Sequence, residues 1–168
     1  MIVQNNIFFP EIKIITPKIY EDNRGHFFEA FNKKLFDKMI IKTQFTQDNE
    51  SHSKKGVLRG LHYQKKPHQQ AKLVRVLNGE ILDVVVDIRP KSKKFGKWIS
   101  VKLNSKNKKQ LWIPEGFAHG FVVTSQKADI LYKTSDFYSK QCDVSINPFD
   151  PDINIKWPKN LKFSSIKK

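Results

Sequence analysis

Residues 72–88, KLVRVLNGEILDVVVDI, decide the fold class of this chain. Two runs rich in Val, Leu and Ile flank the dipeptide Asn78-Gly79. Such runs are typical of β-strands, and Asn-Gly favours the tight turn of a hairpin. The sequence therefore predicts two antiparallel strands joined by a two-residue turn.

The register of this expected hairpin brings two charged residues to one face. Counting back from the turn, Val74 opposes Asp83 and Lys72 opposes Val85, and opposed residues share a face. The other members of that face are apolar, so it is expected to be buried. Lys72 and Asp83 then form either a structural ion pair or part of a ligand site, because a buried pair seldom adds net stability.

The rest of the chain repeats the strand pattern and offers one helix. Leu35, Phe36 and Met39 recur at helical spacing and predict a short helix over residues 33–40. Further strands are expected at residues 13–15, 26–31, 43–49, 56–64, 98–103, 110–113, 120–124 and 129–135. Many strands with almost no helix predict an all-β sandwich or barrel.

Size and composition indicate one globular domain spanning residues 1–168. The chain has a mass of 19.7 kDa and contains 39% hydrophobic and 12% aromatic residues, too apolar for a disordered protein. Cys142 is the single cysteine and cannot form an intrachain disulfide. With neither a signal peptide nor a span of about 18 apolar residues, a cytoplasmic protein that does not enter the membrane is expected.

The formal net charge of +15 admits nucleic acid as a partner, because basic proteins attract polyanions. The lysines, however, occur in short, scattered groups at expected turns and ends, which favours a solvated surface. A phosphorylated small molecule is a further alternative, since it needs only two or three cations.

Residues 56–72, GVLRGLHYQKKPHQQAK, carry the chemistry. Arg59, His62 and Lys72 lie in a strand-like stretch, where burying them is costly unless a polar group lies among them. An imidazole base beside a cation that can stabilise an oxyanion is suited to removing a proton next to a carbonyl. The expected guest is therefore an anion or an oxyanion.

A bound metal is disfavoured by the same residues. A metal site in a small barrel usually has two histidines at alternate positions of one strand. Here Gln64 stands two residues after His62, and the Lys72 cation would repel a divalent ion. No glycine-rich nucleotide motif is present.

Strand parity presents a difficulty. Arg59 and His62 are three residues apart, so a regular strand would direct them to opposite faces. A bulge at Gly60 would bring both to one face.

Other candidates have equally ordinary structural explanations. Arg24 can bind a phosphate or remain a solvated surface residue, and His119 can bind a ligand or be a hydrogen-bonded core residue. Tyr132 and Tyr138 can donate a proton or simply pack.

Several long segments closely resemble the dTDP-4-dehydrorhamnose 3,5-epimerases. They are FTQDNESHSKKGVLRGLHYQ, AKLVRVLNGEILDVVVDIR, FGKW, QLWIPEGFAHGF, ILYKTSDFYS and INPFDPDINIKWP. The resemblance implies a cupin-type jelly roll, a homodimer and an enzyme without cofactor or metal. Its substrate would be dTDP-4-dehydro-6-deoxy-D-glucose, inverted at C3 and C5 on the route to dTDP-L-rhamnose for lipopolysaccharide or another cell-surface polysaccharide.

The resemblance also implies residue roles. His62 is the base, Lys72 stabilises the enolate, Tyr132 returns a proton, and Tyr138 stacks on thymine. The implied substrate-binding positions are Arg24, Glu29, Gln47, Asp48, Asn49, Arg59, Lys72, His119, Tyr138, Asp143 and Lys167. Asp143 stands where the family has a glutamate.

One departure concerns the orientation of His62. The family orients this histidine with an aspartate in an SxKD-like segment, where this chain reads SSIKK. Asp83, on the expected Lys72 face, is the candidate replacement. Two alternatives follow: an enzyme that inverts C3 only or acts on a related dTDP-4-keto sugar, and an impaired member that binds the nucleotide sugar.

Overall fold

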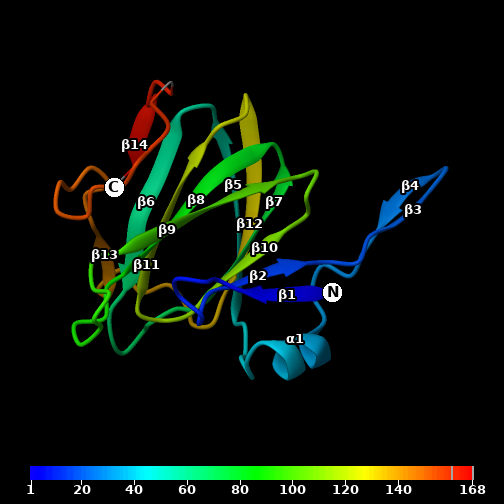
Figure 1. Cartoon of the computed structure of the whole chain (residues 1–168), viewed down its shortest axis with the longest axis horizontal. Coiled ribbons are helices and arrows are strands. Elements are labelled where there is room, and N and C mark those ends of the chain that lie inside the picture. The colour runs from blue at the N-terminus through cyan, green and yellow to red at the C-terminus, as the bar shows by residue number, and fades with distance from the viewer. Residues whose placement is uncertain (160, 168) are drawn as a thin grey trace.

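The computed structural model describes the backbone of residues 1–159 and 161–167 and the side chains of residues 1–159 and 161–164. Two β-sheets stack face to face, as Figure 1 shows. The elements in chain order are β1 (Ile2–Asn5), β2 (Lys13–Thr16), β3 (Tyr20–Asp22), β4 (Gly25–Phe27), α1 (Lys33–Met39), β5 (Gln47–Lys54), β6 (Val57–Gln64), β7 (Lys72–Asn78), β8 (Glu80–Asp87), β9 (Trp98–Asn104), β10 (Gln110–Ile113), β11 (Phe117–Val123), β12 (Lys127–Thr134), β13 (Asp143–Ser145) and β14 (Ser165–Lys167).

The strand order is that of an interleaved sandwich. The first sheet has the order β1-β2-β10-β7-β12-β5, and the second has the order β13-β6-β11-β8-β9, with β14 parallel to β6. β3 and β4 form a separate ribbon that projects away from the two sheets (Figure 1). The prediction of an all-β jelly-roll sandwich with a short helix is confirmed.

The predicted hairpin at Asn78-Gly79 is wrong. β7 pairs with β10 and β12 in the first sheet, whereas β8 pairs with β11 and β9 in the second. The chain crosses from one sheet to the other at Gly79, whose φ is +80° and whose Cβ, if present, would stand 2.0 Å from the carbonyl oxygen of Lys127. A sharp corner needs the same residue types as a hairpin turn, so the local sequence does not distinguish them.

The inference of a buried face nevertheless holds. Val74 and Val76 of β7 and Ile81 and Val85 of β8 all lie in the core between the sheets, each at most 4% exposed. They face one another across the sandwich instead of along a ladder. The alternating pattern identified the buried side chains, although the strand pairing was misassigned.

Polar strands were harder to predict. β5 spans Gln47–Lys54, beyond the expected residues 43–49, because its sequence QDNESHSK has no apolar alternation. Of the expected strand at residues 26–31, only the first two residues fall in β4. The strands β1, β3, β13 and β14, of three or four residues each, were not expected.

The predicted helix is confirmed as α1. The side chain of Asn32 accepts a hydrogen bond from the backbone N–H of Leu35 and caps the first turn. Phe36 packs with Leu73 and Trp112 on the outer face of the first sheet. No helix in the described part of the chain is long and apolar enough to cross a membrane.

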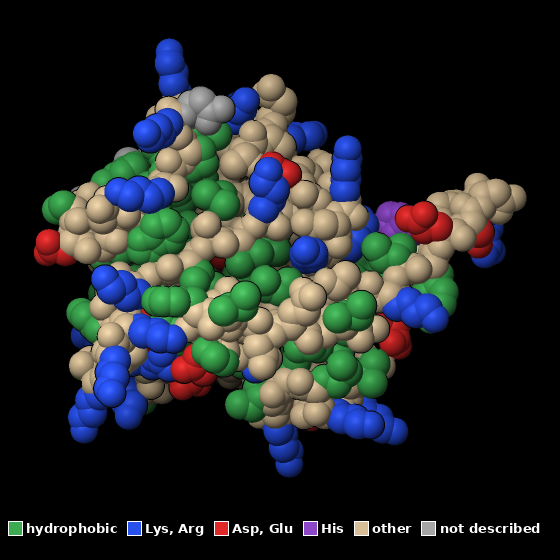
Figure 2. Space-filling model, in the orientation of Figure 1, with side chains coloured by type: hydrophobic (Ala, Val, Ile, Leu, Met, Phe, Trp, Pro, Cys, Tyr) green, Lys and Arg blue, Asp and Glu red, His purple; other side chains and the backbone are tan. Residues whose placement is uncertain are grey.

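The basic side chains are spread over the surface. On the face shown in Figure 2, Lys and Arg side chains stand in separate groups among apolar and neutral residues. This distribution agrees with the interpretation of solvated surface lysines.

Candidate active site

A cavity of about 340 Å³ lies between the two sheets and gathers most of the residues expected in the site. Both sheets contribute to its walls. The sequence-predicted residues that line it are Gln47, Asn49, Arg59, His62, Lys72, His119, Tyr132, Tyr138 and Asp143.

The bulge predicted at Gly60 brings Arg59 and His62 to the same cavity. In the β6–β11 ladder, three steps from Arg59 to His62 match two steps on the partner strand, so β6 carries one extra residue. Gly60 has a φ of +113°, and a Cβ on it would stand 2.6 Å from the Cα of Gly120. Only glycine fits this close approach, and the parity problem is resolved as expected.

His62 is poised to be neutral. Burial lowers the pKa of its imidazole below the usual 6.5; the Asp143 charge opposes this, and Lys72 acts in the same direction as burial. Its Nδ1 lies 3.2 Å from Oγ of Ser145 on the neighbouring strand β13. In the tautomer whose Nδ1–H donates to Ser145, Nε2 is free to accept a proton.

Lys72 and Tyr132 have environments that favour their neutral forms. Burial lowers the pKa of the Lys72 ammonium to about 8, although the charges of Asp83 and Asp143 partly oppose this. Burial also raises the pKa of the Tyr132 hydroxyl above 10. Tyr132 therefore retains its proton at neutral pH, and Lys72 remains a cation that can lose its charge in mildly alkaline solution.

Asp83 contacts His119 and not His62, which corrects the expectation from the sequence. Its Oδ2 lies 2.9 Å from Nε2 of His119, and both residues are buried. The cause is the strand pairing, since β8 lies beside β11 and not beside β7. Among the described residues, Ser145 is the hydrogen-bond partner of the His62 ring, and no carboxylate takes that place.

Asp83 still influences Lys72 through its charge. Its Oδ1 is buried and makes no hydrogen bond with any described residue. Its negative charge is the largest influence that raises the pKa of Lys72 against burial. Asp83 thus holds His119 through one oxygen and helps Lys72 stay charged.

Strand alternation sorts the residues of β5. Gln47, Asn49 and Ser51 line the cavity, because every second residue of a strand faces the same side. Asp48 lies on the opposite face, where both of its carboxylate oxygens accept hydrogen bonds from Lys133 Nζ at 2.9 Å. Asp48, expected to bind the substrate, therefore does not line this cavity.

Arg59 is held in place by two contacts. Its Nε donates to Ser53 Oγ at 2.9 Å, and Nη2 donates to the backbone carbonyl of His52 at 3.3 Å. The remaining N–H groups of the guanidinium are available to a ligand in the cavity.

Tyr138 lines the cavity and is 56% exposed. Its hydroxyl donates to Asp143 Oδ2 at 3.4 Å. Partial desolvation, followed by the Asp143 charge, raises the pKa of this hydroxyl. A large ring that is half open to water offers a flat surface to a second ring.

Comparison with known proteins decides the family. The profile of the family described as dTDP-4-dehydrorhamnose 3,5-epimerase matches residues 6–167. The Shigella flexneri protein of that name is 55% identical over 150 residues, which are 89% of this chain and 83% of the relative. The chain belongs to the dTDP-4-dehydrorhamnose 3,5-epimerase family.

Solved structures of the family share the fold. The Legionella pneumophila epimerase in complex with dTDP-4-keto-L-rhamnose superposes with a TM-score of 0.93 and 48% identity, covering 98% of this chain and 87% of that one. A 3'-monoepimerase from Streptomyces bikiniensis in complex with dTDP-quinovose gives a TM-score of 0.89 and 30% identity, covering 95% and 81%. These neighbours confirm the cupin-type architecture expected from the sequence.

Two residues that the resemblance assigns to substrate binding do not line this cavity. Arg24 sits at the tip of the β3–β4 ribbon, where its guanidinium pairs with Asp22 and its side chain is 85% exposed. Glu29 lines a second cavity of about 200 Å³ beside α1. Within a single chain, Arg24 and Glu29 therefore lie apart from the expected site residues that line the first cavity. The side chain of Lys167 lies outside the described residues.

Sequence reasoning missed several residues of the epimerase-family site. Ser51, Tyr63, Gln64, Gln70 and Phe121 also line the cavity. Ser51 and Gln64 could have been found by alternation, two residues beyond Asn49 and His62. The contact from Ser145 depends on β13, a short strand that no pattern in the sequence predicts. Within the described residues, no group of three or more His, Cys, Asp or Glu side chains could hold a metal ion.

Proposed function

We propose that the protein converts dTDP-4-dehydro-6-deoxy-D-glucose to dTDP-4-dehydro-L-rhamnose by inverting C3 and C5. The observation that carries this proposal is the meeting of His62, Lys72 and Tyr132 in one cavity of a chain from this family. A neutral base, a cation and a protonated phenol are the three groups that enolisation and reprotonation require.

The proposed reaction begins with proton removal beside the C4 ketone. His62 accepts the proton from carbon, and the bonding electrons form a carbon–carbon double bond while the ketone oxygen becomes an enolate. The Lys72 ammonium stabilises this oxygen by hydrogen bonding and charge. Its depressed pKa, about 8, brings the ammonium closer to the acidity at which it can share its proton with the enolate.

Inversion requires that the proton return to the opposite face of the same carbon. Tyr132 is the proposed donor, and the enolate electrons take its phenolic proton to form the new C–H bond. Burial keeps this hydroxyl protonated in the resting enzyme, because it raises the pKa. After transfer, solvent restores the proton to Tyr132 and removes it from His62, so that the cycle can repeat at the second carbon.

The proposed mechanism uses no cofactor and no metal. Lys72 supplies the oxyanion stabilisation that a metal would otherwise supply. The Lys72 and Arg59 charges at the same cavity would also repel a divalent cation.

We propose that Arg59 and Tyr138 bind different parts of the substrate. Arg59 would bind a diphosphate oxygen pair through its free N–H groups, and Tyr138 would stack on thymine. Gln47, Asn49, His119 and Asp143 line the same space and would bind the sugar and nucleotide.

A homodimer is proposed because the single chain leaves two family substrate-binding positions remote. Arg24 and Glu29 lie on or beside the projecting β3–β4 ribbon, away from their own cavity. In a dimer, the ribbon of one chain could reach the cavity of the other. Tyr20 and Phe27 on the ribbon are 54% and 67% exposed, and a partner would cover this apolar surface.

The setting proposed for this enzyme is the cytoplasm. The lone Cys142 is a buried free cysteine, which suits a reducing compartment. The scattered basic groups favour a nucleotide sugar over nucleic acid as the anionic partner.

One experiment tests the activity directly. The purified protein is given the 4-keto-6-deoxy sugar nucleotide together with a reductase that consumes the epimerised product, and nicotinamide oxidation is followed. We expect turnover that disappears in His62→Asn while dTDP binding persists. Binding without turnover in the unsubstituted protein would instead support the impaired, nucleotide-sugar-binding alternative.

A C3-only epimerase is the second candidate, favoured by the likeness to the 3'-monoepimerase from Streptomyces bikiniensis. That likeness is 30% in sequence, against 55% for the 3,5-epimerase from Shigella flexneri. Inversion at both C3 and C5 is therefore the preferred proposal.

A further inference from the structure

Gln64 is a buried polar residue that the proposed chemistry does not use. It is the last residue of β6, two positions after His62, and is 5% exposed. Because alternate residues of a strand face the same side, both residues line the cavity. A buried amide must satisfy its hydrogen bonds, so its partners reveal its role.

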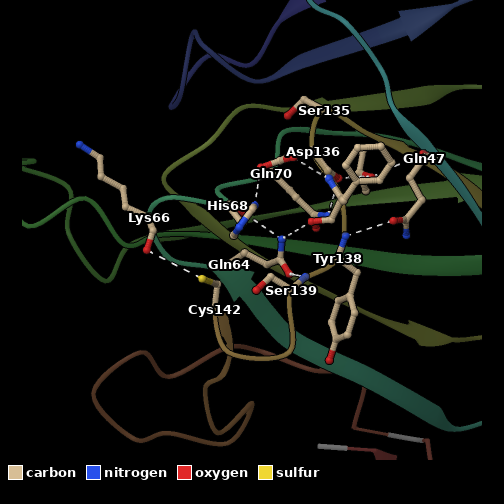
Figure 3. Close-up of polar contacts among 12 residues, drawn as sticks. Gln47, Gln64, Lys66, His68, Gln70, Ser135, Asp136, Tyr138, Ser139 and Cys142 are labelled. Carbon is tan, nitrogen blue, oxygen red and sulfur yellow. Dashed lines mark hydrogen bonds and ion pairs between the residues drawn. The ribbon is translucent and has the colours of Figure 1, made fainter.

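Two of the three hydrogen-bond partners of Gln64 are the residues on either side of Tyr138. Its Nε2 donates to the backbone carbonyls of Phe137 at 3.0 Å and His68 at 2.7 Å, and its Oε1 accepts from the backbone N–H of Ser139 at 2.7 Å (Figure 3). With carbonyls at one end and an N–H at the other, the amide fits in one orientation only. Gln64 thus fastens the residues before and after Tyr138.

Other side chains hold the same segment. Gln47 Oε1 accepts from the backbone N–H of Tyr138 at 3.1 Å, and Asp136 Oδ1 accepts from that of Phe137 at 2.7 Å. Gln70 Nε2 donates to the Asp136 carbonyl at 2.7 Å (Figure 3). The backbone around Tyr138 is therefore fixed by side chains, since this segment follows the end of β12 and belongs to no strand.

These hydrogen bonds to the backbone matter because few other contacts hold the Tyr138 ring. Tyr138 is 56% exposed, and its hydroxyl makes one long contact, with Asp143 at 3.4 Å. An aromatic platform binds a base well only if it is held in place beforehand, because ordering it during binding costs entropy.

We propose that Gln64 is a positioning residue for the nucleobase: by holding the backbone on both sides of Tyr138, it keeps the ring placed to stack on the base of the ligand. This inference rests on the proposed nucleotide-sugar function and deepens it. Gln64 acts through Tyr138 and takes no part in proton transfer.

The test measures binding of two probes by calorimetry: dTDP, and 2-deoxyribose 5-diphosphate, which lacks the base. Gln64→Leu should weaken dTDP binding by roughly fivefold to tenfold, as loss of a base stack does, and leave binding of the abasic probe unchanged. If the leucine variant does not fold, the near-isosteric Gln64→Glu replaces it. This variant places an acceptor opposite the two carbonyls, so it should also weaken dTDP binding and leave binding of the abasic probe unchanged.

A matched control removes an equal number of hydrogen bonds elsewhere. Asn104 also makes three, accepting from the backbone N–H groups of Lys106 and Asn107 and donating to Glu80 Oε2, and it does not line the cavity. Asn104→Leu should leave both affinities unchanged. An equal loss for both probes in Gln64→Leu would indicate general disruption and overturn the inference.

A double-mutant cycle tests whether Gln64 affects dTDP affinity through the Tyr138 ring. In a Tyr138→Ala background, Gln64→Leu should cause no further loss of dTDP affinity, because the ring it positions is gone. A full additional loss would overturn the inference. If the unsubstituted protein does not bind dTDP, the proposed function fails and the positioning role with it; dTDP binding that is unaffected by Gln64→Leu defeats the positioning role alone.

Discussion

Replacing Lys72 by Met is expected to stabilise the protein at pH 7 while removing most of its activity. Burial lowers the pKa of Lys72 from 10.5 to about 8, so the folded state holds this proton less tightly than the unfolded chain does. That difference corresponds to roughly 3 kcal/mol, the upper limit of the stability gained when the charge is replaced by a neutral side chain of similar length.

The stability difference between Lys72→Met and the unsubstituted protein should depend on pH. Below about pH 8 the Lys72 amine is protonated in both states, and the folded protein bears the full cost of the buried charge. Between about pH 8 and 10.5 the folded state has released the proton while the unfolded chain retains it, so the stability of the unsubstituted protein rises. The advantage of Lys72→Met should therefore shrink over this interval and vanish above it.

Urea unfolding at pH 7, 8, 9 and 10 measures the difference, with the exposed Lys102→Met as the control expected to change stability little. The coupled epimerase assay should show a loss of roughly a hundredfold or more in kcat for Lys72→Met, the usual effect of losing an oxyanion donor. A variant that is less stable than the parent at pH 7, or a difference that is constant with pH, would show that the buried Lys72 charge does not destabilise the folded state.

Three further predictions concern the same cavity. The value of kcat/KM should fall below pH 6.5, where His62 takes up a proton, and again near pH 8, where Lys72 loses its charge. Lys72→Arg should move the fall on the basic side to higher pH. A pH profile that is flat would contradict the roles of both residues. Gly120→Ala would place a Cβ 2.8 Å from the carbonyl oxygen of Arg59 and should lower the free energy of unfolding by about 1–3 kcal/mol, measured with urea; an unchanged midpoint would disprove this close approach. Ser145→Ala removes the hydrogen bond to His62 and should reduce kcat roughly fivefold with little change in KM; an unaffected kcat would show that Ser145 does not orient the base.

The fold class could be predicted because alternation of apolar side chains is a local property. Val74, Val76, Ile81 and Val85 were correctly assigned to a buried face. The choice of partner strands is a long-range property, and the corner at Gly79 uses the same residue types as a hairpin turn. The pairing of β7 and β8 was therefore misassigned.

The site shows the same division between local and long-range information. Strand parity alone predicted the bulge at Gly60 that brings Arg59 and His62 together. The partner of Asp83 depended on which strand lies beside β8, and the sequence does not state it. Ser145 was missed for the same reason, since its contact with His62 arises from a three-residue strand without an apolar pattern.

The loop that carries Tyr138 shows why supporting residues are hard to predict. Gln64 and Gln47 serve backbone groups more than 70 residues away in the sequence. A glutamine in a strand has no special local signal, and its function becomes visible only when its hydrogen-bond partners are known.

In the proposed reaction, this cavity removes and returns protons at two carbons beside the C4 ketone. Proton NMR of the 4-keto-6-deoxy sugar nucleotide incubated with the protein in deuterated water tests it most directly. We expect the signals at both C3 and C5 to disappear as deuterium enters, and both to persist with His62→Asn. Exchange at C3 alone would contradict the double inversion, and exchange at neither carbon would contradict the enolisation itself.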